Sequence, residues 1–295
     1  MGTILTSIAV LLRIISNPFG NVFQKQLTIR GVHPLIINFL TYFFLAILCI
    51  CLVVAIKRPV LPTEFWVYSV LAGIAGALGN SFLVKALHKG DLSILGPINS
   101  YKSVVGIIGG IFLLGEFPNF WGLLGVAIII FGSYFVLETT EDRFTWSLLK
   151  RSAIQYRIWA MILNAVEAVF IKKILLVSST TIAFISWCWF GMIFSFLFLY
   201  VYRVNITVEV KNVRIEDLNK YFYLVICIAV MQLTTNYVFK HMPVGYALSL
   251  FQLSIIISVI LGYKYFKEVD IFKKLIGSAI MIAGSVIIIL LKNQF

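Results

Sequence analysis

The second half of this 295-residue chain repeats its first half. Near the end of each half, five residues recur at a constant shift of 152 (268 − 116). Glu116, Gly125, Ala127, Gly132 and Ser133 recur as Glu268, Gly277, Ala279, Gly284 and Ser285. Near the start of each half, four residues recur at a shift of 147 (164 − 17): Asn17, Val22, Phe23 and Lys25 recur as Asn164, Val169, Phe170 and Lys172. The sequence therefore predicts two copies of one structural unit.

Composition places both copies in a lipid bilayer. Hydrophobic residues make up 61% of the chain, charged residues only 12%, and the mean hydropathy is +1.00. That leaves too little charge for the surface of a soluble protein of this size. A membrane-spanning helix needs about 20 apolar residues, and ten stretches qualify: 3–28, 34–56, 64–87, 92–114, 118–138, 153–176, 180–202, 219–240, 244–266 and 270–291. We predict an all-α polytopic membrane protein with ten transmembrane helices and no soluble domain.

Five spans per copy fix how the copies relate to each other. The predicted divisions are a first repeat at 1–138, a linker at 139–152 and a second repeat at 153–295. Because the number of spans per copy is odd, the second copy must insert in the opposite orientation. Inverted repeats of this kind are typical of secondary transporters, whose substrate site lies near mid-membrane where the halves meet.

The formal net charge of +12 does not indicate nucleic-acid binding. The basic residues stand singly or in pairs at span ends, where lysine and arginine anchor helices at the membrane interface. The four cysteines lie in apolar runs without metal-ligand spacing, so we expect no metal and no cofactor. Lysine and arginine are more numerous in the connections that follow odd-numbered spans, which by the positive-inside rule places both termini outside.

Ionisable residues inside the spans are the strongest functional candidates, because a charge at this depth is costly and normally marks a pathway. Arg13, Lys102 and Glu167 each lie near mid-depth of a predicted span. Carboxamides share their helix faces, and Asn17 and Asn80 match Asn164 and Gln232 in the other half. The predicted substrate-binding residues are Arg13, Asn17, Asn21, Asn80, Asn99, Lys102, Asn164, Gln232 and Asn236.

The charges, unlike the carboxamides, are not duplicated. Under the same shifts Arg13 corresponds to Ala160, Lys102 to Ser254 and Glu167 to Gly20. Glu167 is accordingly predicted as a proton-coupling residue. The alternative is a structural counter-ion of Arg13 or Lys102 in a packed core.

Two further features of the spans carry expectations. Gly96 and Pro97 predict a kinked hinge in the fourth span, because proline removes a backbone hydrogen bond. In the second copy Ser249 stands in place of Pro97, so the sequence gives no reason for a kink there. Glu116 and Glu268, just ahead of spans five and ten, are interpreted as helix-start residues favoured by the helix dipole.

The motifs of the first half are those of a known transporter family. They are Ala86-Leu87, Gly90-Asp91-Leu92-Ser93, Gly96-Pro97, Gly115-Glu116 and Gly125 followed by Gly132-Ser133, and a weaker copy runs through the second half, where Lys267 replaces Gly115. The chain resembles the ten-helix, EamA-like branch of the drug/metabolite transporter superfamily. This resemblance implies five plus five inverted spans, cytoplasmic termini, and export or exchange of a small metabolite or drug.

Four functions remain open on the sequence alone. Two cations against one acid favour a transporter of a small anionic or zwitterionic metabolite, such as an amino acid, with lipids and protons as the other partners. The alternatives are a proton-coupled exporter of lipophilic cations that uses Glu167, and a flippase for a lipid-linked phosphate or sugar. A membrane enzyme is disfavoured because no HExxH, GxSxG, P-loop or paired-aspartate motif is present. The expected location is the plasma (inner) membrane of a prokaryote.

Overall fold

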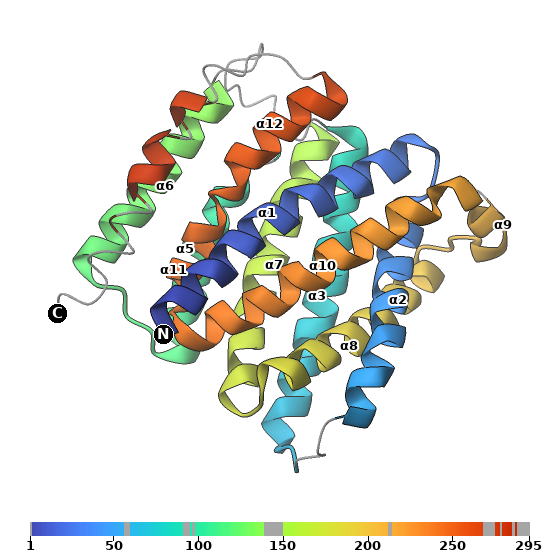
Figure 1. Cartoon of the computed structure of the whole chain (residues 1–295), viewed down its shortest axis with the longest axis horizontal. Coiled ribbons are helices and arrows are strands. Elements are labelled where there is room, and N and C mark those ends of the chain that lie inside the picture. Colours follow the sequence, from blue (N-terminus) through green and yellow to red (C-terminus); the bar gives the residue numbers. More distant parts are fainter. Residues whose placement is uncertain are drawn as a thin grey trace.

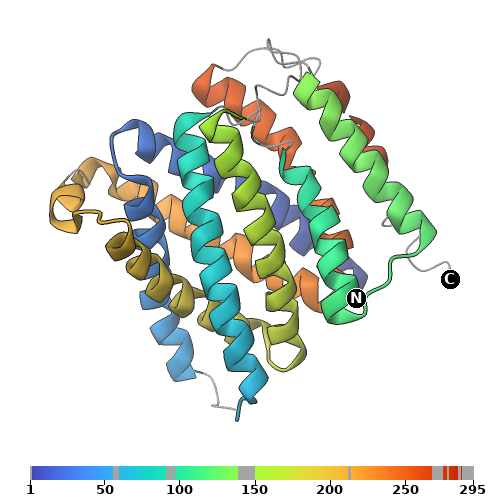
Figure 2. The same ribbon diagram turned by 180° about the vertical axis from the view of Figure 1, so that it is seen from behind.

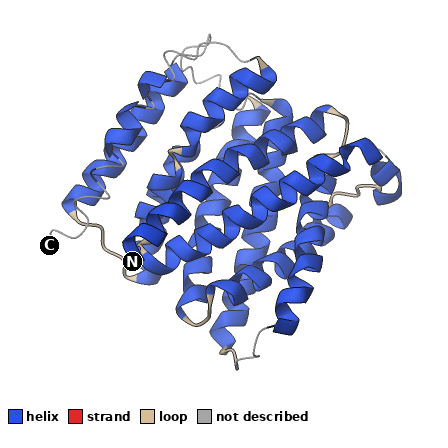
Figure 3. Ribbon diagram, viewed as in Figure 1, coloured by secondary structure: helices blue, strands red, loops and turns tan. Residues whose placement is uncertain are grey.

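The computed structural model describes residues 2–55, 60–90, 95, 98–138, 150–211, 214–267, 275–277, 279–284 and 287. Every regular element in these residues is a helix, and none is a strand (Figure 3). The long helices are α1 (Gly2–Ile29), α2 (Pro34–Ala55), α3 (Thr63–Lys89), α6 (Phe120–Glu138), α7 (Ser152–Leu176), α8 (Thr180–Val201) and α10 (Leu218–His241). The short α9 (Ile206–Lys211) and η4 (Ile215–Asp217) lie in the polar connection between α8 and α10.

The helix lengths and hydropathies confirm the predicted membrane class. Within the described residues, six helical segments are long and apolar enough to cross a bilayer, and three shorter apolar helices accompany them. Helix α7 is 25 residues long but carries four charged side chains, which are Arg157, Glu167, Lys172 and Lys173. The protein is an all-α polytopic membrane protein made of two repeats.

The fourth and ninth spans are both broken, and at equivalent positions. The fourth contains η1 (Asn99–Tyr101), α5 (Lys102–Gly109) and the π-helical turn η2 (Gly110–Leu114). The ninth consists of α11 (Val244–Phe251) and α12 (Ser254–Phe266), separated by a two-residue turn. Helices α5 and α12 begin at residues related by the shift of 152 (254 − 102). The predicted hinge at Gly96 and Pro97 lies outside the described residues.

The ninth span breaks without a proline, and Gln252 shows how. Its backbone N–H bonds to the carbonyl of Ser249 at 3.0 Å, a tighter turn than the α-helical bond to Leu248. Its side-chain Nε2 then donates to the Leu248 carbonyl at 2.8 Å. Because the side-chain amide replaces the lost backbone donor, the Leu248 carbonyl stays hydrogen-bonded at the break.

The crossing of α6 with the helical residues 275–277 and 279–284 shows that the copies are inverted. A Cβ added to Gly132 would lie 2.6 Å from the Gly277 carbonyl oxygen, and one added to Gly284 would lie 2.6 Å from that of Gly125. Residue numbers rise along one helix as they fall along the other, so the two run antiparallel. Since Gly125 and Gly132 correspond to Gly277 and Gly284, equivalent helices of the two copies point in opposite directions.

Equivalent helix pairs form the centre of the molecule. Helix α1 packs along α10, and its counterpart α7 packs along α3, the counterpart of α10. The first pair crosses the front of the molecule in Figure 1, and the second is seen from behind in Figure 2. These two pairs face each other across the interior, so the polar faces predicted on α1, α3, α7 and α10 converge there.

Candidate functional site

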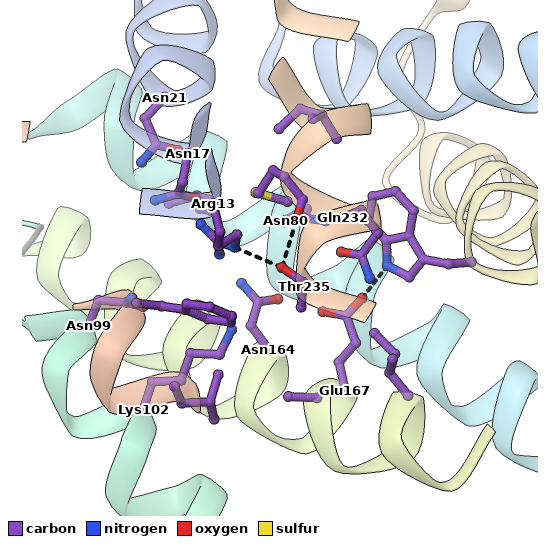
Figure 4. Close-up of a pocket in the computed structure, with 18 of the residues that line it drawn as sticks. Arg13, Asn17, Asn21, Asn80, Asn99, Lys102, Asn164, Glu167, Gln232 and Thr235 are labelled. Carbon is purple, nitrogen blue, oxygen red and sulfur yellow. Dashed lines mark hydrogen bonds between the residues drawn. The ribbon is translucent and has the colours of Figure 1, made fainter. Parts of the chain in front are cut away.

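A cavity of about 80 Å³ lies where the two halves meet. Such a volume holds several water molecules or a small polar solute. Its lining comes from α1, α2, α3, α7, α8, α10, α11 and the start of the broken fourth span. Eight of the nine predicted substrate-binding residues line it: Arg13, Asn17, Asn21, Asn80, Asn99, Lys102, Asn164 and Gln232 (Figure 4).

Arg13 enters this cavity from α1. Its Nε donates to the Thr235 hydroxyl of α10 at 2.8 Å, and its guanidinium lies 4.9 Å from the centre of the Phe251 ring. Both contacts orient the group, but neither partner is an anion. The buried Nη1 has no hydrogen-bond partner among the described residues. A donor left unpaired in this way favours a ligand acceptor at the site.

Lys102 begins α5 at the break of the fourth span and also faces the cavity. In the part of the chain that is described, its ammonium makes no hydrogen bond and no ion pair within 4 Å. Arg13 and Glu167 likewise form no ion pair within 4 Å among these residues. Among the described residues Glu167 therefore forms no direct ion pair within 4 Å with either cation, although both lie in electrostatic range of it.

Glu167 bonds to an aromatic side chain instead of a cation. Its Oε1 accepts the indole N–H of Trp187 from α8 at 2.6 Å. The side chain is 8% exposed, and it fits against α3 because position 76 is glycine: a Cβ there would overlap Oε1. The close approach of α3 and α7 thus requires Gly76 and places the carboxylate at the cavity wall.

The carboxamides divide into paired and unpaired groups. Asn80 donates to the Tyr42 hydroxyl at 2.5 Å, Asn99 donates to Gln252 Oε1 at 3.2 Å, and Gln232 donates to Asn236 at 2.9 Å. Asn164 Oδ1 is buried without a partner, and Asn17 and Asn21 make no side-chain bond to another described residue. Asn17 and Asn21 remain available to a ligand, whereas Asn164 Oδ1 packs against Gly79 of α3.

Asn236 is the one predicted binding residue outside the cavity lining. Its side chain is fully buried, and its Nδ2 donates to the Thr180 carbonyl at 3.2 Å. Its contacts tie α10 to the start of α8 and orient Gln232. Its place is structural, because carboxamides at i and i+4 can serve helix packing as well as a pathway.

Comparisons with known proteins agree with this architecture. A solved structure titled "Crystal structure of protein" superposes with a TM-score of 0.71 over 98% of both chains, at 16% sequence identity, and so supports the fold alone. No curated protein sequence matches the chain significantly. The sequence profile described as the EamA-like transporter family matches residues 4–138 and 151–290. The chain belongs to the EamA-like transporter family.

Several side chains in the cavity of this EamA-like transporter were not predicted from the sequence. Tyr42, Trp187 and Thr235 hold the candidate residues in place, and Arg157 adds another cation. The aromatic residues gave no signal because such residues are common throughout membrane helices. Arg157 stands only six residues (157 − 151) after Arg151, which directly precedes α7, and an arginine so near a helix end ordinarily reaches the interface.

Glu116 corrects another prediction for this EamA-like protein. It precedes α6, but the start of α6 is bonded by Asn119, whose Oδ1 accepts the Gly122 N–H at 2.8 Å. Glu116 Oε2 instead accepts the Val244 N–H at 2.8 Å, at the start of α11 in the other repeat. The helix dipole that stabilises the Glu116 carboxylate is therefore that of α11, 128 residues away in the sequence, and not that of α6. Glu268 lies outside the described residues.

Lys172 completes this contact between the repeats of the EamA-like transporter. Its Nζ lies 3.6 Å from Glu116 Oε1 and donates to the carbonyls of Phe239 and Met242, the latter at 3.2 Å. Glu116, Lys172 and the α11 N-terminus together form what we call the inter-repeat seam. It ties the two halves at the end of the molecule where α7 ends and α11 begins.

Proposed function

We propose that this chain is a secondary transporter of a small anionic or zwitterionic metabolite, such as an amino acid, which it moves by alternating access through the central cavity. One observation carries the proposal: Arg13 and Lys102 line the cavity and, among the described residues, neither has a carboxylate oxygen within 4 Å. Unpaired cations at such depth are costly. A substrate carboxylate or phosphate would pair with both.

The remaining lining supports a substrate with further polar groups. Asn17 and Asn21 have unused donors or acceptors. Glu167, whose one described partner is the Trp187 N–H, could bind a substrate ammonium or exchange a proton. A zwitterion would therefore have its carboxylate at Arg13 and Lys102 and its ammonium near Glu167.

A lipophilic cation is disfavoured by the same charges. Three basic side chains, Arg13, Lys102 and Arg157, line the cavity against the one acid Glu167 among the described residues. A bound organic cation would meet net repulsion in a site of low dielectric constant.

A thermal-stability screen of the purified protein in detergent tests the proposal. Ligands of three kinds are compared: amino acids and organic acids, lipophilic cations, and lipid phosphates. A ligand at one hundred times its dissociation constant stabilises the folded state by about 2.7 kcal/mol. We expect acids or zwitterions to stabilise the protein, and the Lys102→Ala variant to lose this response. Stabilisation by lipophilic cations alone would overturn the proposal.

A further inference from the structure

A third cation lies at one end of the cavity. Arg157 is only 6% exposed and sits in the second turn of α7, and its Nε donates to the Leu95 carbonyl at 2.8 Å. Among the described residues this carbonyl is its one hydrogen-bond partner. A guanidinium offers five N–H donors in a planar fork. Four of them therefore remain for other acceptors.

Arg157 lines a second, smaller pocket as well as the main cavity. This second pocket has a volume of about 10 Å³, roughly that of one water-sized site. Asn17, Asn21, Leu83 and Asn99 line both, so the small pocket extends the cavity. Its other walls include the hydroxyl-bearing Ser254 and Ser258. The extension is therefore polar and carries one buried cation.

Arg157 lies well away from Glu167 along α7. Along α7 it precedes Glu167 by ten residues (167 − 157), or roughly 15 Å of helix. Arg13 and Lys102 lie in electrostatic range of Glu167, and Arg157 in range of Lys102. A carboxylate bound at Arg13, in electrostatic range of Glu167, therefore leaves the remaining donors of Arg157 for a second group. The two ends of the cavity thus call for two anionic groups.

The net charge of the lining residues also favours a ligand with two anionic groups. Three cations and one acid among the described lining residues leave an excess of two positive charges when all are ionised. Val10 occupies the place of Arg157 in the first repeat (157 − 147), so this cation, like Arg13 and Lys102, is not part of the duplicated scaffold. A ligand with two negative groups balances the excess.

We propose that Arg157 and the polar extension form a second anion-binding subsite, so that the substrate is a small organic acid with an anionic group at each end. Dicarboxylic acids and amino dicarboxylic acids have this chemistry. The inference rests on the proposed function, because it assumes that Arg13 and Lys102 bind the first anionic group. A planar guanidinium suits a carboxylate, since two parallel hydrogen bonds can form.

Matched pairs of acids test the second subsite by ligand-induced thermal stabilisation of the whole protein in detergent. Each pair has the same chain length but one or two carboxylates: butyrate and succinate, valerate and glutarate, glutamine and glutamate. We expect the diacid of each pair to bind roughly tenfold or more tightly, because it gains a charge-assisted bidentate contact. Arg157→Gln should remove this preference and leave monoacid binding within about twofold.

Two further variants separate binding from folding. Arg151→Gln removes the same charge from an exposed residue at the start of the same helix, and should keep the full preference. Arg157→Lys keeps the charge but not the planar guanidinium, and should keep part of the preference for diacids. If Arg157 only ties the Leu95 carbonyl, Arg157→Gln lowers the melting temperature without changing the preference, and the inference is overturned.

The outcomes also distinguish this inference from the proposed function. Equal stabilisation by monoacids and diacids in the unmodified protein overturns the second subsite and leaves the proposed function intact. Absence of stabilisation by any acid overturns both.

Discussion

Neutralising Glu116 should weaken the inter-repeat seam and so open that end of the molecule. In Glu116→Gln an oxygen acceptor for the Val244 N–H remains, at a contact of 2.8 Å in the native protein. The charge is lost, and with it the attraction to Lys172 at 3.6 Å and to the dipole of α11. The change therefore weakens the seam without altering side-chain size.

The size of this effect follows from the contacts. A hydrogen bond to a charged group is worth roughly 1 kcal/mol more than a neutral one, and a partly exposed ion pair adds about 0.5 kcal/mol. Together they give about 1.5 kcal/mol, or roughly a tenfold change in an equilibrium constant. We expect the population open at the seam to rise by about that factor.

The measurement uses a single cysteine in the cavity wall. Ala168→Cys, in a background without the four native cysteines, places a thiol next to Glu167. Its rate of reaction with a membrane-impermeant reagent added on the seam side should rise about tenfold in Glu116→Gln. Glu64→Gln is the control, because Glu64 is an exposed acid in the first turn of α3. Equal rates in both variants would refute the role assigned to the seam.

Three other predictions address the cavity and the caps that end η2 and α12. Lys102→Ala should abolish substrate uptake into proteoliposomes in a folded, expressed protein, because it removes an unpaired cation from the site; normal uptake would exclude Lys102 from the site. Glu167→Gln should uncouple uptake from a pH gradient while sparing substrate exchange, because a carboxamide can still accept the Trp187 N–H but cannot carry a proton; unaltered gradient-driven uptake by the stable variant would rule out proton coupling. Gly115→Ala should lower the melting temperature and Lys267→Gly should raise it, since both positions are left-handed with φ of 67° and 55°, and a side chain there costs about 1 kcal/mol. Changes of the opposite sign in a thermal unfolding assay would contradict this account of the caps.

The sequence by itself determined the class of the fold, its repeat and nine of the residues that line the cavity. Long apolar runs can only be membrane helices, because unpaired backbone groups are too costly in lipid. Polar residues within such runs must turn away from lipid, so the pattern alone assigns Arg13, Lys102 and Glu167 to the interior of the bundle. The 152-residue shift between the two repeats also relates the first residue of α5, Lys102, to the first residue of α12, Ser254.

What a polar side chain bonds to was decided only by tertiary structure. Asn236 and Gln232 share one helix face, yet Asn236 ties α10 to α8 while Gln232 lines the cavity. Glu116 caps a helix of the other repeat, and Arg157 lies in the cavity although it is close to the start of α7. Helical periodicity places a residue on a face, but its partner comes from another helix whose approach depends on packing across the whole bundle. Such contacts lie far apart in the chain, and no local pattern in the sequence encodes them.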